Sequence, residues 1–387
     1  MIYLVPIFLL IAITFTIGDN KKFKIIKKFI LITFCLSFVF ISAFRFETGT
    51  DWFPYYSFFN FYSYQEMLSF YFEPFYKLLA VFIKYLFNNY TIFLFIVGLF
   101  FLIEVHSLWK IAEKNIISYN IIILLLSSYM FFFPGFMGGN RQAIALALCA
   151  VSLKYLVKKN LLTSILYWSI SMLFHYSAIL FVFNIIIYLL ISDNEKKLFK
   201  LGNIKVFFLV VVFFGSMYLI YNGDFLAYFN KSPILSNLVS YQGYSAVNLD
   251  LNYDFRDTVL ILERLGLNFI IIFAFRYYKK SKINKFLLAS YTFGTIFYIF
   301  FMFNARTIAG RGILYFRYAD IFILATLPKA LSNRILDGGN DQFKIKGKYL
   351  SELMVSFLVI SYIIFRFLFV ILYANSIYYL PYKSIFK

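Results

Sequence analysis

Long apolar runs, separated by short polar stretches, follow one another along the whole chain. Most runs approach the length of about 20 residues with which an α-helix crosses a bilayer, and none alternates like a membrane β-strand. The pattern therefore predicts an all-α, polytopic integral membrane protein that forms a single domain over residues 1–387. About twelve spans are expected, at residues 2–17, 29–44, 90–109, 116–133, 141–157, 161–174, 177–191, 206–221, 259–275, 286–303, 313–331 and 350–373.

Lysine and arginine clusters indicate how these spans are oriented. They occur in every second loop, at residues 21–28, 110–114, 158–159, 196–205 and 276–285. Cytoplasmic loops retain such clusters during insertion, so these loops are expected on the cytoplasmic side. The same orientation places Arg141 and His175 together at the outer face, because each lies beside an outer loop.

Residues 74–87 are the one ambiguous apolar segment. Lys77 and Lys84 are seven residues apart and mark one face of an amphipathic helix, which lies in a membrane interface more readily than it crosses the bilayer. We therefore expect an interfacial or re-entrant helix within the first outer loop, residues 45–89. If this segment crossed instead, every later loop would invert and the lysine bias would fail.

Composition supports a membrane protein: 62% of the residues are hydrophobic, 23% are aromatic and only 14% are charged. The net charge of +19 does not point to nucleic acid, because the lysines are confined to short clusters between apolar runs. Cys35 and Cys149 both lie within expected spans, so no disulfide is expected. The first apolar run lacks a preceding Lys or Arg and a following cleavage site, so we expect it to be retained as a helix.

Some ionisable residues lie within or at the outer ends of spans, where each costs about 2.5–3.5 kcal/mol at mid-bilayer unless it faces a polar cavity. Arginines predominate, and a guanidinium binds phosphate in a bidentate manner, so a diphosphate is the expected guest. Arg141 also opens a helix after Gly138 and Gly139, where backbone N–H groups favour anions. The set is Arg45, Asp51, Arg141, His175, Glu263, Arg264, Arg306, Arg311, Arg317, Asp320 and Arg366.

Structural explanations remain open for several of these residues. Arginines at helix ends can extend to lipid headgroups, and Arg317 can pair with Asp320 one helical turn away, as Glu263 can pair with Arg264. His175 can be an interfacial histidine with a satisfied hydrogen bond. Near Asp51, the aromatic side chains can either stack on sugars or form an interfacial belt.

Three short motifs resemble the EpsG family of exopolysaccharide and O-antigen polymerases, the Wzy-type enzymes. The first is Arg45 with the run Gly49-Thr50-Asp51-Trp52 and Tyr55, the second is Gly139-Asn140-Arg141-Gln142, and the third is Phe174-His175-Tyr176-Ser177. The resemblance implies a GT-C-like membrane glycosyltransferase, without metal or cofactor. It would join undecaprenyl-diphosphate-linked oligosaccharides at the outer face of the cytoplasmic membrane, for O-antigen, capsule or exopolysaccharide synthesis. A chain-length regulator and a flippase are the implied protein partners.

Under this resemblance, the candidate residues have the following roles. Arg141 and Arg317 hold the diphosphate, Arg45 orients the loop or binds a second diphosphate, and Asp51 or His175 accepts the proton. Arg264 and Arg311 are further candidates for the diphosphate, and Trp52 and Tyr55 for sugars. Two alternatives remain: a transporter or flippase of a lipid-linked glycan, which would also use arginines in a cavity, and an O-antigen ligase.

Overall fold

The computed structural model describes residues 2–10, 24–116, 119–191, 255–274, 281–304, 306–335, 341–374 and 376–386. Within these ranges the structure is helical, with one isolated β-bridge between Arg45 and Ser384 and no strand, so the all-α prediction is confirmed there. The expected span at residues 206–221 lies outside the described residues.

Three described helices are long and apolar enough to cross a membrane: Tyr90–Lys114, Lys282–Met302 and Leu350–Tyr373. Shorter apolar helices cover Lys28–Ala43, Ile121–Met137, Leu161–Met172 and Tyr176–Leu190. The apolar helices agree with a membrane protein, whereas twelve spans and a GT-C-like arrangement stay predictions.

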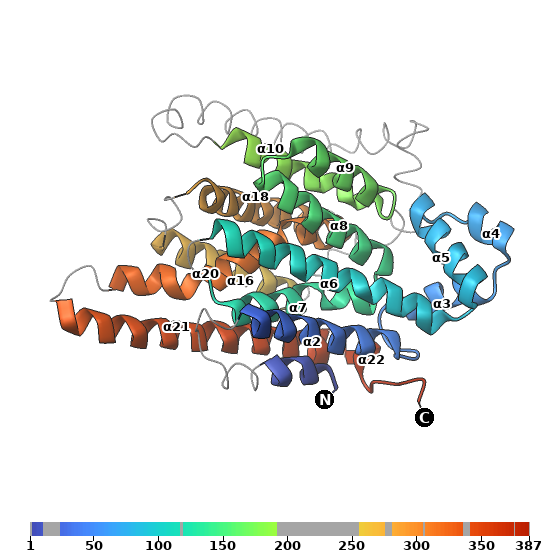
Figure 1. The fold of residues 1–387 in the computed structure, drawn as a ribbon, viewed down its shortest axis with the longest axis horizontal. Helices are drawn as coiled ribbons and strands as arrows, with labels where there is room; N and C mark the ends of the chain where they lie inside the picture. Colours follow the sequence, from blue (N-terminus) through green and yellow to red (C-terminus); the bar gives the residue numbers. More distant parts are fainter. Residues whose placement is uncertain are drawn as a thin grey trace. The chain divides into compact units, whose positions relative to one another are not determined.

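The described residues group into two compact units, residues 1–181 with 317–387 and residues 182–316. The single domain therefore stays a prediction, and each unit is described by itself. The helices of the first unit (Figure 1) are α2 (Lys24–Ala43), α3 (Trp52–Asn60), α4 (Tyr64–Ser69), α5 (Pro74–Phe87), α6 (Tyr90–Asn115), α7 (Ile121–Met137), α8 (Asn140–Val157), α9 (Leu161–Met172), η3 (Tyr176–Phe181), α20 (Arg317–Ile335), α21 (Asp341–Phe369), η6 (Val370–Ala374) and α22 (Ser376–Tyr379), after the turn η1 (Ile2–Leu4).

Helix α8 is the centre of this unit. It packs against α6, α7 and α9, and nearly all its side chains are buried, including those that open it. Small residues such as Ala143 and Ala147 allow the neighbouring helices to approach closely. Asparagine side chains cap three of the surrounding helices: Asn89 at α6, Asn120 at α7 and Asn160 at α9.

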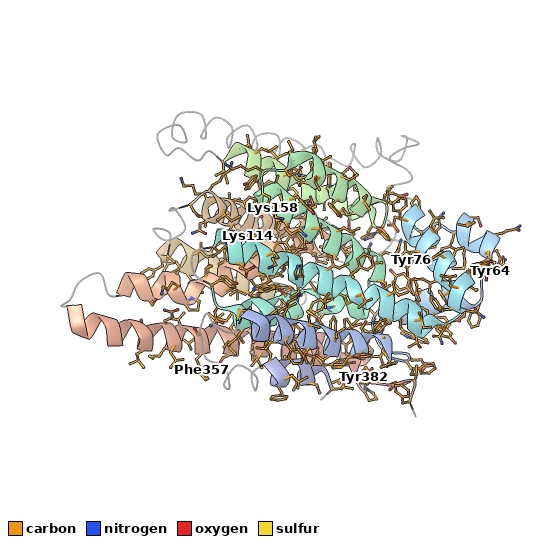
Figure 2. All side chains as sticks on the ribbon, viewed as in Figure 1. Tyr64, Tyr76, Lys114, Lys158, Phe357 and Tyr382 are labelled. Carbon is orange, nitrogen blue, oxygen red and sulfur yellow. The ribbon has the colours of Figure 1, made fainter. Side chains whose placement is uncertain are left out.

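The two ends of this unit differ in chemistry. His106 on α6 lies near the charges of Lys28, Lys110 and Lys154. Lys114 and Lys158 are at the C-terminal ends of α6 and α8, on the same side of the bundle (Figure 2). Arg141 precedes Lys154 by 13 residues along α8, which is about 20 Å in an α-helix. The lysine cluster and Arg141 therefore lie at opposite ends of the bundle, as the predicted orientation requires.

Helix α5 is amphipathic, but its lysines have protein partners. Lys84 Nζ donates to the carbonyl of Tyr62 at 2.8 Å, and Lys77 Nζ donates to the carbonyls of Leu68 and Phe70 at 2.6 and 3.0 Å, so the lysine face covers the chain ends of α3 and α4. A second, apolar face is exposed, with Phe82 60% accessible. The 14 residues of α5 extend about 21 Å, less than the roughly 30 Å hydrocarbon core. An interfacial position in the membrane stays a prediction.

The C-terminal segment packs along the start of the first large loop. Phe46 N donates to Lys383 O at 2.9 Å, and Gly49 N donates to Tyr378 O at 2.8 Å. Tyr3 near the N-terminus donates its hydroxyl to Tyr379 O at 2.8 Å. Segments from both ends of the chain therefore fix the loop that carries the first motif.

The second unit contains α10 (Val182–Leu190), α16 (Phe255–Phe273), α18 (Lys282–Asn304), α19 (Arg306–Ile313) and η5 (Leu314–Phe316). Buried Asn184 connects three of these elements: its Nδ2 donates to Tyr315 O at 2.9 Å, and its Oδ1 accepts from Ser290 Oγ at 2.5 Å. The expected helix at residues 177–191 begins instead as the 3₁₀ helix η3 and becomes α-helical at Val182.

Candidate functional site

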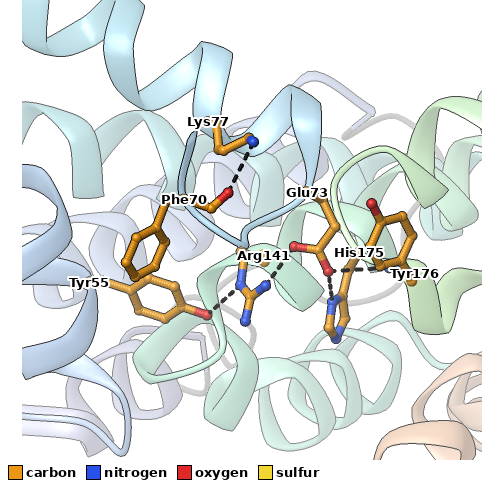
Figure 3. Close-up of polar contacts among 7 residues, drawn as sticks. All are labelled: Tyr55, Phe70, Glu73, Lys77, Arg141, His175 and Tyr176. Atoms are coloured by element: carbon orange, nitrogen blue, oxygen red, sulfur yellow. Dashed lines mark hydrogen bonds and ion pairs between the residues drawn. The ribbon is translucent and has the colours of Figure 1, made fainter. Parts of the chain in front are cut away.

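Glu73 is the central residue of a buried polar cluster at the end of the first unit opposite the lysines (Figure 3). Its side chain is 1% exposed, and each carboxylate oxygen has a charged or titratable partner. Oε2 is 2.6 Å from Nη1 of Arg141, and Oε1 is 2.7 Å from Nδ1 of His175. The cluster thus joins one carboxylate, one guanidinium and one imidazole from three separate parts of the chain.

Local structure explains how these residues meet. Glu73 occupies the N-cap position of α5 and is followed by Pro74, but its side chain does not cap its own helix. His175 lies in the turn between α9 and η3, and Phe75 N donates to Leu173 O at 3.0 Å, which holds the start of α5 against this turn. Tyr176 N also donates to Glu73 Oε1 at 3.4 Å. The turn therefore fixes the carboxylate beside the imidazole.

Arg141 is held by aromatic residues as well as by Glu73. Its Nε donates to the Tyr55 hydroxyl at 3.2 Å, and the guanidinium carbon lies 4.1 Å from the centre of the Phe72 ring. A guanidinium over an aromatic face is stabilised by a cation–π interaction, which is stronger where water is excluded. Burial raises the pKa of Tyr55 to about 12, so the hydroxyl that accepts this hydrogen bond stays protonated.

The electrostatics determine which nitrogen of His175 carries the hydrogen. Burial raises the pKa of Glu73, but the hydrogen bond and charge of His175 and the charge of Arg141 more than offset this and hold that pKa at about 2. An ionised carboxylate can only accept hydrogen bonds, so His175 must donate from Nδ1. In the neutral imidazole the lone pair then lies on Nε2, the nitrogen that can accept a proton.

A model of the EpsG family matches residues 28–338, most of the chain. The chain belongs to the EpsG family. This family is associated with Wzy-type polymerases, which makes the chain a polysaccharide polymerase-like membrane protein. No curated protein and no solved structure matches the chain.

The three EpsG-like motifs meet in the first unit. Tyr55 of the first motif, Arg141 of the second and His175 of the third all belong to the buried cluster. Gln142 Nε2 also donates to Ser177 Oγ at 3.5 Å, which connects the second and third motifs directly. Arg141 and His175 therefore lie together at one end of the bundle, as predicted, whereas the outward orientation of this end stays a prediction.

Sequence reasoning missed Glu73, the residue that connects Arg141 and His175. The first loop holds four acidic residues, and the sequence favours only Asp51 as a candidate because it follows Gly49-Thr50. One signal pointed to the missing residue: a buried arginine needs a counter-charge. That signal does not choose among four carboxylates in the same loop.

Asp51 and Trp52 occupy other positions. Asp51 precedes α3 without capping it, and among the described residues its carboxylate has no hydrogen bond or ion pair. Trp52 is 4% exposed; it stacks on Tyr56 at 4.5 Å and meets Tyr90 edge-on at 6.0 Å. These aromatic neighbours pack around the indole ring, and its role toward sugars stays a prediction.

Arg45 connects the end of α2 to the end of α7 and the start of α8. Its Nη1 donates to Phe136 O at 2.5 Å and to Ser42 Oγ at 2.8 Å, and its Nη2 donates to Asn140 Oδ1 at 3.2 Å. These contacts favour the role in which Arg45 orients the loop. They also connect the first motif to the residue that opens α8.

Two glycines allow this loop to interlock with the α7–α8 turn. Gly49 has a φ of +110°, and a Cβ there would lie 1.7 Å from Met137 O. A Cβ on Gly138 would lie 2.0 Å from Thr50 Oγ1. By contrast, a Cβ on Gly139 would meet nothing closer than 3.9 Å. Gly49 is therefore required for the close approach of the two backbones, and Gly138 leaves room for the Thr50 side chain.

The remaining arginine candidates have partners of their own. Arg317 Nη1 is 2.7 Å from Asp320 Oδ2, which confirms the expected pair. Arg264 and Arg311 belong to the second unit; Arg264 is buried and its Nη1 donates to Thr295 Oγ1 at 3.1 Å, while Arg311 is half-buried. Convergence of these arginines with Arg141 stays a prediction. Among the described residues, no group of three His, Cys, Asp or Glu side chains is arranged to hold a metal ion.

Proposed function

We propose that this protein is a Wzy-type glycosyltransferase that joins undecaprenyl-diphosphate-linked oligosaccharide repeat units at the outer face of the cytoplasmic membrane. EpsG family membership supports a polymerase, and the separation of the lysine cluster from Arg141 supports a site on the outer side. The observation that carries the chemistry is the 2.7 Å contact between Glu73 and Nδ1 of His175.

In the proposed reaction, a hydroxyl of the acceptor oligosaccharide attacks the anomeric carbon of the donor. The new bond joins the hydroxyl oxygen to that carbon. The bond from the same carbon to the diphosphate oxygen breaks, and its electron pair leaves with the diphosphate. His175 Nε2 accepts the hydroxyl proton, while Glu73 holds the imidazole in this tautomer and stabilises the imidazolium that forms. Lipid diphosphate is a good leaving group, so stabilisation of its departing charge is the main task left to the arginines.

His175 is favoured over Asp51 as the base. The imidazole is oriented by an ionised carboxylate, whereas none of the described residues orients the Asp51 side chain by a hydrogen bond. Arg141 is the arginine nearest to this chemistry and is proposed to bind the diphosphate, with Arg317, Arg264 and Arg311 as further contributors. A flippase that supplies the substrate and a chain-length regulator are the proposed protein partners.

The test uses purified full-length protein and a lipid-linked repeat unit, with products separated by length on a gel. The wild-type protein should produce a ladder of products. Loss of a general base lowers the rate by about 10²–10⁴-fold, so His175→Ala should abolish the ladder, and Arg141→Ala should do the same. His106→Ala is the matched control because it removes the only other histidine and lies on α6 at the lysine end, where the ladder should be unaffected.

Two results would contradict the proposal. A single unextended band with the wild-type protein would favour a transporter or flippase. Normal long chains from Arg141→Ala at an unchanged protein level would remove Arg141 from the reaction.

A further inference from the structure

The Glu73 carboxylate occupies the place on Arg141 that an anionic ligand would need. Carboxylate and phosphate groups present similar oxygen acceptors to a guanidinium, and both form short charge-assisted bonds with it. Oε2 of Glu73 makes such a contact with Nη1 of Arg141 at 2.6 Å, and both side chains are buried. A diphosphate that approaches this nitrogen therefore meets a bound competitor.

We propose that the diphosphate of the substrate displaces Glu73 from Arg141, and that the released carboxylate then acts on His175 alone. Glu73 is thus both a competitor for the anion site and the group that couples its occupation to the proton acceptor. This inference rests on the proposed function for the identity of the diphosphate, and it concerns the order of events at the same site.

Arg141 has supports that do not depend on Glu73. Tyr55 accepts from Nε at 3.2 Å, while the ring of Phe72 lies 4.1 Å from the guanidinium carbon. The guanidinium therefore stays in position when Nη1 exchanges one oxygen partner for another.

Glu73 keeps its contact with His175 through the other carboxylate oxygen. Oε1 is 2.7 Å from Nδ1 of His175 and accepts from Tyr176 N at 3.4 Å, and the backbone bond from Phe75 to Leu173 holds α5 at this turn. In the free protein, one negative charge is shared between a guanidinium and an imidazole. Once Arg141 binds the diphosphate, the Glu73 charge is no longer neutralised by the guanidinium and stabilises a proton on His175 more strongly.

The consequence is a base that becomes stronger only after the donor has bound. Proton removal from an acceptor hydroxyl is thereby coupled to the presence of a diphosphate leaving group. While no diphosphate is bound, the pairing of Glu73 with Arg141 ensures that neither buried charge is left without a partner.

Binding of inorganic pyrophosphate, measured by calorimetry on full-length protein in detergent, tests the competition. Glu73→Gln should bind pyrophosphate on the order of tenfold more tightly than the wild type, because a charge-assisted bond no longer competes for Arg141. Arg141→Gln should lose binding. Glu113→Gln is the matched control: it removes an exposed carboxylate that pairs with Lys110 at 2.7 Å at the lysine end, and its affinity should equal that of the wild type.

Equal or weaker binding by Glu73→Gln would overturn the proposal, because Glu73 would then only orient Arg141. If Glu73→Gln does not fold, the wild type still provides a test. With its two histidines labelled for NMR and assigned through a His106 variant, saturating pyrophosphate should shift the Nδ1 resonance of His175 and leave that of His106 unchanged. An unchanged His175 resonance at saturation would also refute the proposal.

The gel assay separates this inference from the proposed function. A wild-type ladder together with weaker pyrophosphate binding by Glu73→Gln would refute only the competition. Tighter binding by Glu73→Gln without any wild-type ladder would refute only the polymerase.

Discussion

Replacing Glu73 with glutamine should destabilise the protein by an amount that depends on pH. Glutamine has the shape of a protonated glutamate, so the variant resembles a protein whose carboxyl never ionises. The folded protein lowers the pKa of Glu73 from 4.5 to about 2 because His175 and Arg141 outweigh the cost of burial. At about 1.4 kcal/mol per pH unit, this lowering corresponds to about 3 kcal/mol of folding free energy.

The sign follows from the direction of the pKa change. A carboxyl with a lowered pKa stabilises the folded state fully above its unfolded pKa, and this contribution is lost as the pH falls through the folded pKa. The wild type should therefore exceed Glu73→Gln by about 3 kcal/mol at about pH 5.5, which is above the unfolded pKa of Glu73 and below the ordinary pKa of an imidazole. The difference should begin to shrink near pH 4.5 and disappear near pH 2.

The measurement is the free energy of unfolding in detergent micelles for both proteins over this pH range. Other carboxyls protonate in both proteins, so their effects cancel in the difference. Glu113→Gln should differ from the wild type by less than about 0.5 kcal/mol, because its pair with Lys110 is partly exposed. If the stability difference between the two proteins were the same at every pH, the loss would be due to packing and not to the charge of Glu73. If there were no difference at about pH 5.5, the pairing of Glu73 with His175 and Arg141 would be refuted.

Three further substitutions test other parts of the structure. Gly49→Ala should yield little folded protein, seen as the loss of the monodisperse peak in size-exclusion chromatography, because its Cβ would overlap a backbone carbonyl. Gly139→Ala is the control and should elute as the wild type does, because a Cβ at Gly139 has open space around it. Glu104→Met should raise the midpoint of thermal unfolding by a few degrees. Glu104 is fully buried in α6, both of its carboxyl oxygens lack a hydrogen-bond partner among the described residues, and such burial costs about 1–3 kcal/mol. An unchanged or lower midpoint would contradict this prediction. Tyr55→Phe keeps the ring packing but removes the hydroxyl that accepts from Arg141 Nε. It should lower the free energy of unfolding by about 1 kcal/mol and reduce polymer formation. Wild-type stability together with a wild-type product ladder would contradict this prediction.

Sequence reasoning was most accurate where a local pattern carries the information. Apolar runs predicted the helices, and the lysine clusters predicted that the lysines and Arg141 lie at opposite ends of the bundle. Both patterns depend only on residues that are close together in the chain. The pair Arg317–Asp320 was also predictable, since residues three apart on a helix are neighbours. The sequence also predicts that Gly138 and Gly139 precede a helix start that favours anions, and this stays a prediction. Only the structure shows that Gly138 also leaves room for the Thr50 side chain of the first loop.

Sequence alone therefore determined the helical class, the family motifs and the common end on which Arg141 and His175 lie. Only the tertiary structure selected Glu73 as their partner, because the choice among four acidic residues depends on how α3, α4 and α5 fold back on the bundle. The backbone bond between Phe75 and Leu173 places Glu73 beside His175, across about 100 residues of sequence. No periodicity or spacing records such a contact, since it exists only when separate helices pack together.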